Sequence, residues 1–467
     1  MLSKVKITYI DSSDISCCYF TESQIKHLNL NINKNQIILS VGSLDINLNV
    51  VILDEHNNLN LNRLYLSKNV KNYIYLDEGT LLQLKQIDNN HLSIGPLIGV
   101  FINQEKFDYL LRGKGITAYT QFFKACESLY GLCCFFSIET IDWNNKLIKG
   151  LSKKNSQWTM NTFPLPKIIY DRNVENNCRA ESILLRNNLR DSCHILNSIP
   201  KLAKLQTFDA LRKNPKLNYI IPETIPYEDV NDLKNALNKY HSIYLKPDAL
   251  SKGKGVFRVR KISDIEYGVE YRTAEENHKF TLTNLLNLEN VMAPFYEKGG
   301  RYLIQKEINK APFDDSDFDL RVLFQKNWQG TWHISGISGR ISAPGSVITS
   351  PRSGGRVENF EVILKRTFNE SYDTPNGIYS NILYYGKEVC SSIESEFGDC
   401  VELGLDIAID TNKRIWIIEV NGKPLKVSLK RLNDPALFSL CNKRPIEYAV
   451  YASGFKSADT SLGGLLE

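Results

Sequence analysis

The sequence predicts a mixed α/β protein with a small β-rich domain at its start, and three observations carry this prediction. Short segments of alternating apolar and polar residues, separated by Asn and Asp, fill residues 1–112. From residue 113 onward, helix-like and strand-like segments alternate, beginning with 118–130, 131–138 and 167–170. Near the end, residues 401–424 are typical of two strands joined by a tight turn.

The overall composition is that of a globular protein. With 467 residues, 42% of them hydrophobic and 23% charged, the chain is long enough for several domains. A net charge of +5 over this length, without a dense basic tract, predicts no nucleic-acid partner. No apolar run reaches the ~20 residues that span a bilayer, so no membrane association is expected. The ten cysteines form no CxxC or zinc pattern, which favours a reducing, cytoplasmic location.

The middle of the chain contains a strand, a glycine-rich loop and a second strand. Residues 229–240 have helical spacing, and the strand after them ends in Lys246 and Pro247. The loop Ser251-Lys252-Gly253-Lys254-Gly255 follows. Its backbone N–H groups could close over phosphates, although an ordinary hairpin turn fits the same pattern. It is not a GxxxxGK[ST] loop. Further on, a helix is expected over 279–297, strands over 301–308, 319–325 and 331–340, and a helix over 374–397.

The hairpin at 401–424 gathers oxygen ligands. Alternation puts Asp406 on the polar face of its first strand, and Glu419 and Asn421 share one face of the second. With a symmetric turn, Gly404 lies opposite Glu419, and Asp406 lies diagonal to it. Two carboxylates and an amide oxygen suit Mg²⁺. A solvated polar face on an ordinary hairpin is the alternative.

Several motifs occur in an order that resembles the ATP-grasp superfamily. IGPLIGVF at 94–101, FPLPKIIYDR at 163–172, IIPET at 220–224 and YLKPDALSKGKGV at 244–256 look, more narrowly, like the YheC/YheD group of spore-coat-associated ATP-grasp proteins. The resemblance implies four parts. These are an N-terminal β-rich domain at 1–112, an α/β pre-ATP-grasp domain at 113–198, a central small lobe at 199–300 and a C-terminal lobe with the Mg-ATP site at 301–467.

The resemblance also implies roles for particular residues. Lys204 and Lys246 would contact ATP phosphates, and Ser251, Gly253, Lys254 and Gly255 would belong to the closing flap. Gln305, Lys306, Glu307 and Ile308 match the hinge that reads adenine. Arg321 and Arg340, together with Lys246, would act on the γ-phosphate or the oxyanion of the intermediate. Asp406, Glu419 and Asn421 match the Mg²⁺ ligands.

The reaction implied is an ATP-dependent ligation of a carboxylate to an amine through an acyl phosphate, with ATP and two Mg²⁺ ions. The substrates would be amino acids, peptides or related small molecules, and spore coat proteins are candidate partners. Two alternatives stay open. One is a coat-associated nucleotide-binding or scaffold protein without turnover, which the large flap residues Leu250 and Lys252 favour. The other is a kinase that phosphorylates a hydroxyl.

Overall fold

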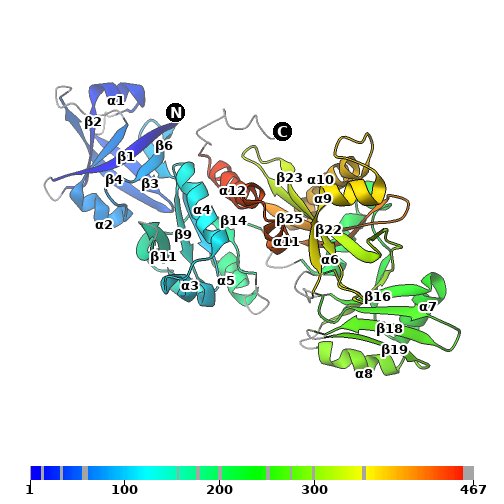
Figure 1. Ribbon diagram of the computed structural model, residues 1–467. Coiled ribbons are helices and arrows are strands. Elements are labelled where there is room, and N and C mark those ends of the chain that lie inside the picture. Colours follow the sequence, from blue (N-terminus) through cyan, green and yellow to red (C-terminus); the bar gives the residue numbers. More distant parts are fainter. Residues whose placement is uncertain are drawn as a thin grey trace. The chain divides into compact units, whose positions relative to one another are not determined.

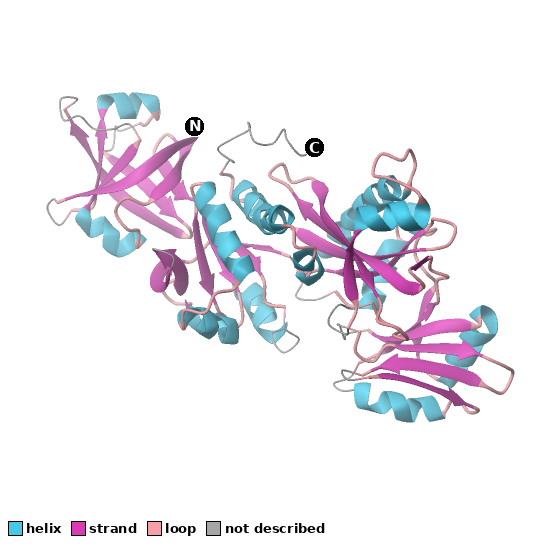
Figure 2. Cartoon of the chain, viewed as in Figure 1, coloured by secondary structure: helices cyan, strands magenta, loops and turns pink. Residues whose placement is uncertain are grey.

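The computed structural model describes residues 2–11, 15–31, 35–54, 62–154, 157–174, 179–197, 202–248, 253–273, 276–296, 300–349 and 354–455. They form two compact units. The first comprises the described parts of Met1–Pro200, Lys326–Thr331 and Asn442–Glu467, and the second those of Lys201–Gln325 and Trp332–Cys441. Figure 1 traces the chain through both, and Figure 2 shows that each unit contains sheets and helices. The mixed α/β class is therefore confirmed.

The first unit opens with a closed β-barrel, drawn in blue in Figure 1. Its interior is filled by the inward residues of the strands, among them Ile7, Ile37 and Leu39. Closure leaves the barrel without an unpaired edge strand. Around the barrel the order is β1 (Leu2–Ile10), β5 (Arg63–Ser67), β2 (Cys17–Thr21), β4 (Leu44–Leu53), β3 (Gln36–Val41), β7 (His91–Gly95) and β6 (Leu81–Asp88), with the short helices α1 (Glu22–His27) and α2 (Lys71–Ile74).

A second sheet completes the β structure of this unit. Its order is β10 (Ile141–Asp142), β11 (Leu147–Lys154), β9 (Leu132–Phe136), β8 (Leu97–Phe101), β13 (Ile168–Asp171) and β14 (His194–Leu196), and β12 (Gln157–Pro164) pairs with β11. Strands β9, β8, β13 and β14 are parallel. The helices are α3 (Gln104–Leu111), α4 (Thr117–Ser128) and α5 (Arg179–Leu189). The barrel strands thus end at Gly95, and the next strand already belongs to the second sheet. The four-part division at residues 112, 198 and 300 stays a prediction.

The second unit contains two sheets, and we call the first the small-lobe sheet. Its order is β15 (Thr224–Tyr227), β20 (Tyr302–Lys306), β16 (Ser242–Pro247), β17 (Phe257–Lys261), β18 (Tyr267–Arg272) and β19 (Asn277–Leu282). One face is apolar and packs against α7 (Val230–Tyr240) and α8 (Asn287–Met292), with Leu237, Leu245 and Phe257 in the shared core. The helix predicted over 279–297 is wrong at its start, because 277–282 pair with β18; 287–292 form an α-helix, and 293–295 continue it as a 3₁₀ turn.

The other sheet, here called the large-lobe sheet, has the order β24 (Arg356–Asn359), β23 (Trp332–Ile341), β22 (Ser316–Lys326), β25 (Glu402–Ile409) and β26 (Ile415–Asn421), and β21 (Pro312–Phe313) pairs with β22. Phe318, Leu320 and Val322 on β22 face a core to which α10 contributes Ile382 and Val389. The remaining helices are α6 (Lys204–Arg212), α9 (Phe360–Ile363), α10 (Ile378–Phe397), α11 (Val427–Arg431) and α12 (Pro435–Ala452). Because side chains alternate along a strand, β22 turns Asp319 and Arg321 to the opposite face.

Among the described residues, no helix is long and apolar enough to cross a membrane. Nine cysteines of the described ranges are free thiols and buried. They act there as small apolar side chains.

Candidate active site

Each sheet of the second unit has one polar face, and the candidate site lies where these two faces meet. On the small-lobe sheet, register places Tyr244 opposite Gln305 on one side and opposite Arg258 on the other, so the three side chains share a face. Lys246, two residues beyond Tyr244, points the same way. On the large-lobe sheet, Arg321 lies opposite Asp406.

Lys246 on the small-lobe sheet has a strongly lowered pKa. Its Nζ donates to Oε1 of Gln305 at 2.5 Å, and Nε2 of Gln305 donates to Oγ1 of Thr224 at 3.0 Å. Burial is the main reason that the pKa of Lys246 falls to about 8; Glu419 and Asp406 oppose the fall, and Lys204 and Lys310 add to it. A bound anion would offset this desolvation, so the position favours phosphate.

Lys204 links the two lobes. It stands at the start of α6, where its Nζ donates to the carbonyl oxygen of Pro247 on β16 at 3.1 Å. The same Nζ lies 3.6 Å from Oε1 of Glu419 on β26. The side chain of Lys204 is only 10% exposed, so its charge is largely buried between the two polar sheet faces and does not lie on a solvated surface.

On the large-lobe sheet, Asp406 is held by two arginines. Arg321 donates from Nε to Oδ1 at 2.5 Å and from Nη2 to Oδ2 at 3.2 Å. Arg340 places its Nη2 2.9 Å from Oδ2, and its Nε donates to Oδ1 of Asp319 at 2.5 Å. Burial by itself would raise the pKa of Asp406, but the two guanidinium groups outweigh it and lower the pKa.

The hairpin of β25 and β26 forms as predicted, but its register differs. Asp406 lies directly opposite Glu419, and Gly404 lies opposite Asn421. The predicted pairing of Gly404 with Glu419 is therefore wrong. The register shifts at a bulge next to Asp406, and a symmetric turn cannot reproduce such a shift. The correction brings the two carboxylates closer in register than the sequence suggested.

The three predicted metal ligands offer the right chemistry for a hard cation. Within the described ranges, no group of three or more His, Cys, Asp or Glu is placed to hold a metal, so the candidate depends on two carboxylates and an amide. Glu419 is 31% exposed, and among the described residues its carboxylate makes a single ion pair, at 3.6 Å with Lys204, so its oxygens are accessible to Mg²⁺. Asp406 already accepts from two arginines. The oxygen set fits Mg²⁺, and Asp406 as a direct ligand stays a prediction.

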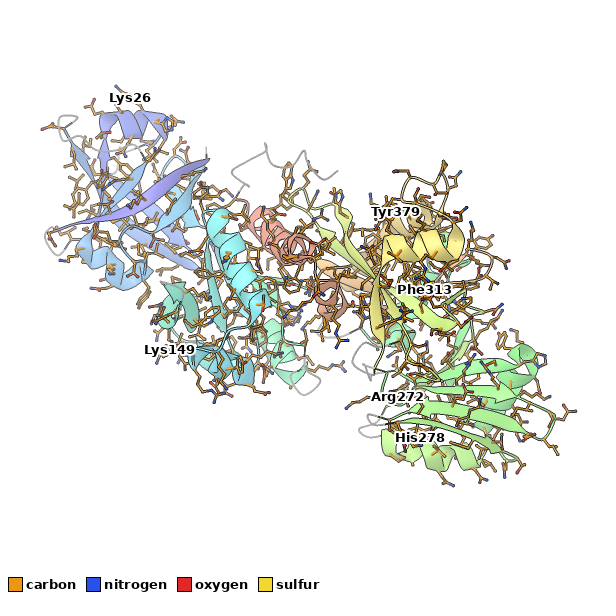
Figure 3. All side chains as sticks on the ribbon, in the orientation of Figure 1. Lys26, Lys149, Arg272, His278, Phe313 and Tyr379 are labelled. Carbon is orange, nitrogen blue, oxygen red and sulfur yellow. The ribbon has the colours of Figure 1, made fainter. Side chains whose placement is uncertain are left out.

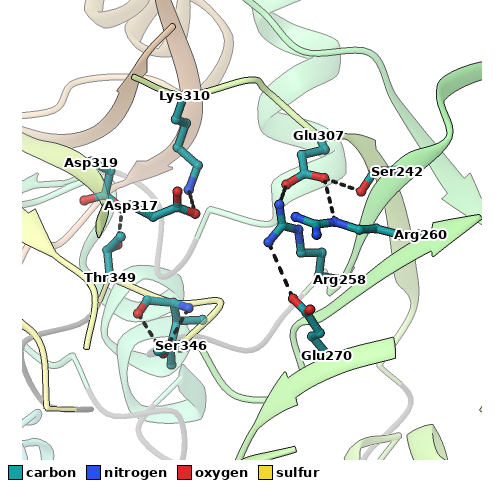
Figure 4. A network of polar contacts seen from close by, with 11 residues as sticks. Ser242, Arg258, Arg260, Glu270, Glu307, Lys310, Asp317, Asp319, Ser346 and Thr349 are labelled. Carbon is teal, nitrogen blue, oxygen red and sulfur yellow. Dashed lines mark hydrogen bonds and ion pairs between the residues drawn. The ribbon is translucent and has the colours of Figure 1, made fainter. Parts of the chain in front are cut away.

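The predicted adenine hinge lies at the end of β20. Gln305 is buried and Lys306 is exposed, while Ile308 is half-buried. The carboxylate of Glu307 accepts from Ser242 and Arg258 and lies 3.7 Å from Nε of Arg260 (Figure 4). That side chain is therefore engaged within the small-lobe sheet. The backbone N–H groups of Lys306 and Glu307 also donate within this sheet, to the carbonyl oxygens of Glu223 at 2.9 Å and Ser242 at 3.3 Å. Adenine recognition stays a prediction.

The predicted flap is described only in part, because Ser251 lies outside the described residues. Lys254 is exposed, and Gly253 and Gly255 have positive φ angles of +73° and +68°. A Cβ on Gly253 would lie 2.9 Å from Cδ1 of Ile348, and a Cβ on Gly255 would lie 2.8 Å from Oη of Tyr302. Glycine is required at both positions by backbone conformation and by close approach.

Four further polar residues of the site were not among those predicted from the sequence: Lys310, Asp317, Asp319 and Thr349. Asp319 accepts from Arg340. It also accepts from Oγ1 of Thr349, and Nζ of Lys310 donates to Asp317 at 3.2 Å (Figure 4). Asp317, Asp319 and Arg321 recur every second residue of one strand. That spacing was the available signal, because it puts all three charges on one face.

Cations and carboxylates are nearly balanced across the two polar faces. Arg258 accompanies Glu270 and Glu307 on the small-lobe sheet. The other charges of the site are those of Lys204, Lys246, Lys310, Arg321, Arg340, Asp317, Asp319, Asp406 and Glu419. An anionic ligand that brings its own divalent cations would keep this balance.

Comparison with known sequences decides the family. The profile described as YheC/D like ATP-grasp matches residues 192–451, more than half of the chain. The chain belongs to this ATP-grasp family. All the candidate residues discussed above lie inside the matched range, and the family assignment made from the sequence motifs is confirmed.

Individual proteins are similar to this chain at low sequence identity. Endospore coat-associated protein YheD of Bacillus subtilis (strain 168) is 26% identical over 385 residues, which cover 79% of this chain and 81% of YheD. YheC of the same organism is 23% identical over 291 residues, 60% of this chain and 76% of YheC. Among solved structures, D-cycloserine synthetase DcsG is similar at 11% identity and a TM-score of 0.46, covering 76% of this chain and 99% of DcsG.

Proposed function

We propose that the protein is an ATP-dependent ligase that joins a carboxylate to an amine through an acyl phosphate. The observation that carries this proposal is the group of charged side chains between the two polar sheet faces. Lys204 and Lys246 meet Glu419 between two polar sheet faces, and Arg321 and Arg340 flank Asp406 beside them. The ATP-grasp family supplies the nucleotide as substrate.

In the first step, an oxygen of the substrate carboxylate attacks the γ-phosphorus of ATP. The new O–P bond forms as the bond to the β–γ bridging oxygen breaks, and ADP leaves. Lys246 and Lys204 would neutralise phosphate charge from the two sides of the crevice. Of their donor groups, Arg321 and Arg340 use Nε and Nη2 on Asp406 and Asp319, so in the described structure Nη1 of each can serve the transferred phosphoryl group.

In the second step, the amine nitrogen attacks the acyl carbon and the bond from that carbon to the phosphate oxygen breaks. Inorganic phosphate leaves with the bonding electron pair and takes up the proton that the amine nitrogen loses. The arginines would stabilise the oxyanion that forms in between. Asp406, Glu419 and Asn421 would hold Mg²⁺, which supplies charge neutralisation at the phosphates when bound. The protein positions the reactants, and no side-chain nucleophile is needed.

Hydroxylamine trapping tests this reaction. The purified protein would be given Mg-ATP, hydroxylamine as the amine and a panel of amino acids and short peptides as carboxylates. Formation of a hydroxamate with equal release of ADP is the expected result. The Lys246→Met variant should lose the product. Transfer of phosphate to a hydroxyl, with no hydroxamate for any carboxylate, would identify a kinase instead.

A second candidate function follows from the relatives, both of which are named for association with the endospore coat. In this case the ATP-grasp fold would act in coat assembly without turnover. Nucleotide binding measured by thermal unfolding addresses it. A ligand present at 100 times its dissociation constant stabilises the state that binds it by about 2.7 kcal/mol. Absence of any shift with Mg-ATP would favour the scaffold over the ligase.

A further inference from the structure

Segments beside the large-lobe sheet form a pocket that the proposed reaction does not use. Its volume is about 430 Å³, within the size range of small-molecule sites. Three segments line it: the chain around β21, the end of a π-helix, Leu364–Phe368, and the turn between β25 and β26. The lining residues are Ala311, Pro312, Phe313, Asp314, Arg366, Thr367, Phe368, Thr411 and Lys413.

This pocket lies on the other face of the large-lobe sheet from the candidate active site. The ring centre of Phe318 is 6.5 Å from that of Phe313 and 6.4 Å from that of Phe368. Phe318 points into the core side of β22, whereas Asp319 points to the polar face. Figure 3 labels Phe313 on the large lobe. A ligand here would therefore be separated from the nucleotide crevice by the sheet.

Hydrogen bonds hold the three segments together. The backbone N–H of Ala311 donates to the carbonyl oxygen of Ile409 at 2.9 Å, and Nζ of Lys413 donates to the carbonyl oxygen of Phe368 at 3.0 Å. The π-helix is a rare element that recurs at functional sites. Here it places Arg366, Thr367 and Phe368 at the pocket as three consecutive residues. The site is thus built by fixed backbone and not by loose side chains alone.

The charges around the pocket are arranged for an anion. The guanidinium groups of Arg356 and Arg366 both bind Asp314, at 2.9 and 2.5 Å, and lie 5.5 and 4.8 Å from the ring centre of Phe313. Lys413 pairs with Glu370 at 3.0 Å. Three cations therefore face two carboxylates. The side chains of Arg366 and Lys413 are about half exposed. The ion pair of Arg366 with Asp314 is exposed on both sides, so it is weak and can rearrange around a ligand. Lys413 uses two of its three N–H groups on Glu370 and on the carbonyl oxygen of Phe368, so the third can donate to a ligand.

We propose that this pocket binds a small multivalent oxyanion, a carboxylate or phosphate compound, whose charge is held by Arg366 and Lys413 and whose carbon skeleton lies against Ala311 and Pro312. The hydroxyls of Thr367 and Thr411 supply further hydrogen bonds. This binding does not depend on the ligase reaction. The pocket would thus be a second ligand site, and its residue Ala311 closely follows Ile308, the last residue of the predicted hinge.

Isothermal titration calorimetry with citrate in one arm and inorganic phosphate in the other tests the proposal and separates the two sources of charge. Arg366→Gln should weaken binding of the preferred anion about tenfold, because a charge-assisted hydrogen bond is lost. Lys413→Gln should weaken it similarly. Lys365→Gln is the matched control, since Lys365 is an exposed cation of the same π-helix that does not line the pocket.

A variant with the opposite expected effect on anion affinity strengthens the test. Asp314→Asn removes the carboxylate that competes for both arginines, and asparagine tolerates the φ of +49° found there. This variant should bind the anion more tightly than the wild type. Any anion bound in the nucleotide crevice contributes equally to all variants. Absence of binding in both arms, or equal affinities in the wild type, Arg366→Gln and Asp314→Asn, would overturn the proposal.

Discussion

Asp406 is buried in the candidate site and Lys246 is half-buried there, and their surroundings decide which form of each is stable. The two arginines around Asp406 keep it ionised although burial opposes this. Around Lys246, burial acts against the charged form and outweighs the favourable charge of Glu419, while Lys204 and Lys310 add to the effect of burial. The charge of Asp406 is thus balanced within the protein, whereas that of Lys246 is balanced only in part and favours an anionic ligand. This asymmetry is what a phosphate site needs before its substrate arrives.

The pH dependence of stability follows from Lys246. Its folded pKa of about 8 is below the ordinary value of 10.5, so between these values the unfolded chain binds more protons and wild-type stability rises with pH. Lys246→Met should therefore raise the melting temperature at pH 7, and the gain should shrink as the pH rises through this window. Calorimetric melting temperatures between pH 6.5 and 10 measure it. Lys306→Met on the exposed end of β20 serves as control and should show no such trend.

Asp406 and Glu419 are expected to differ when their charges are removed. Asp406→Asn leaves Arg321 and Arg340 without their shared carboxylate, and breaking a buried pair in this way costs about 3 kcal/mol or more. Glu419→Gln affects a partly exposed side chain and should change stability by about 0.5 kcal/mol or less. Yet Glu419→Gln should abolish the Mg²⁺ dependence of ATP binding.

Urea unfolding and ATP titrations with and without Mg²⁺ separate these effects. Wild-type Mg²⁺ dependence in the stable Glu419→Gln variant would remove Glu419 from the metal site.

At the scale of elements, the sequence showed which strands exist better than how they pair. Alternation in residues 401–424 predicted the hairpin, and strands over 319–325 and 331–340 were predicted where β22 and β23 lie. The register of the hairpin was missed because the bulge beside Asp406 depends on contacts outside the two strands. The start of the helix predicted over 279–297 was wrong because pairing with β18 outweighs local preference there.

The flap provides a prediction for an element. Gly255→Ala should destabilise the small lobe by about 2 kcal/mol or more, because the new Cβ meets Oη of Tyr302 at 2.8 Å and Cβ of Phe295 at 3.1 Å in a left-handed backbone. Gly113→Ala is the control, since Gly113 has a similar φ of +76° with open space around it and should lose about 1 kcal/mol.

Limited proteolysis of the flap, compared with urea unfolding, measures both variants. Equal losses in the two would show that backbone strain alone, and not packing of the flap end, explains the glycine.

At the scale of the whole molecule, the chain returns to its first unit at its end. Residues 442–455 group with that unit, and Phe455 lies against Gly95 at the end of the barrel strands, with Nζ of Lys85 5.9 Å from its ring centre. Local patterns could not predict this return, because the partners lie at opposite ends of the sequence. The family profile ends at residue 451, so it covers the first part of the returning segment but not Phe455.

Phe455 should therefore stabilise the first unit from a distance in sequence. Phe455→Ala removes a ring that is only 7% exposed and should cost about 2–4 kcal/mol. Hydrogen exchange should show the loss in β6 and β7 of the barrel, and nucleotide binding in the second unit should be unchanged. Tyr451→Ala, at a side chain 49% exposed, is the control and should cost about 1 kcal/mol or less. Lost protection in the small-lobe sheet, with the barrel unaffected, would contradict this role for the chain end.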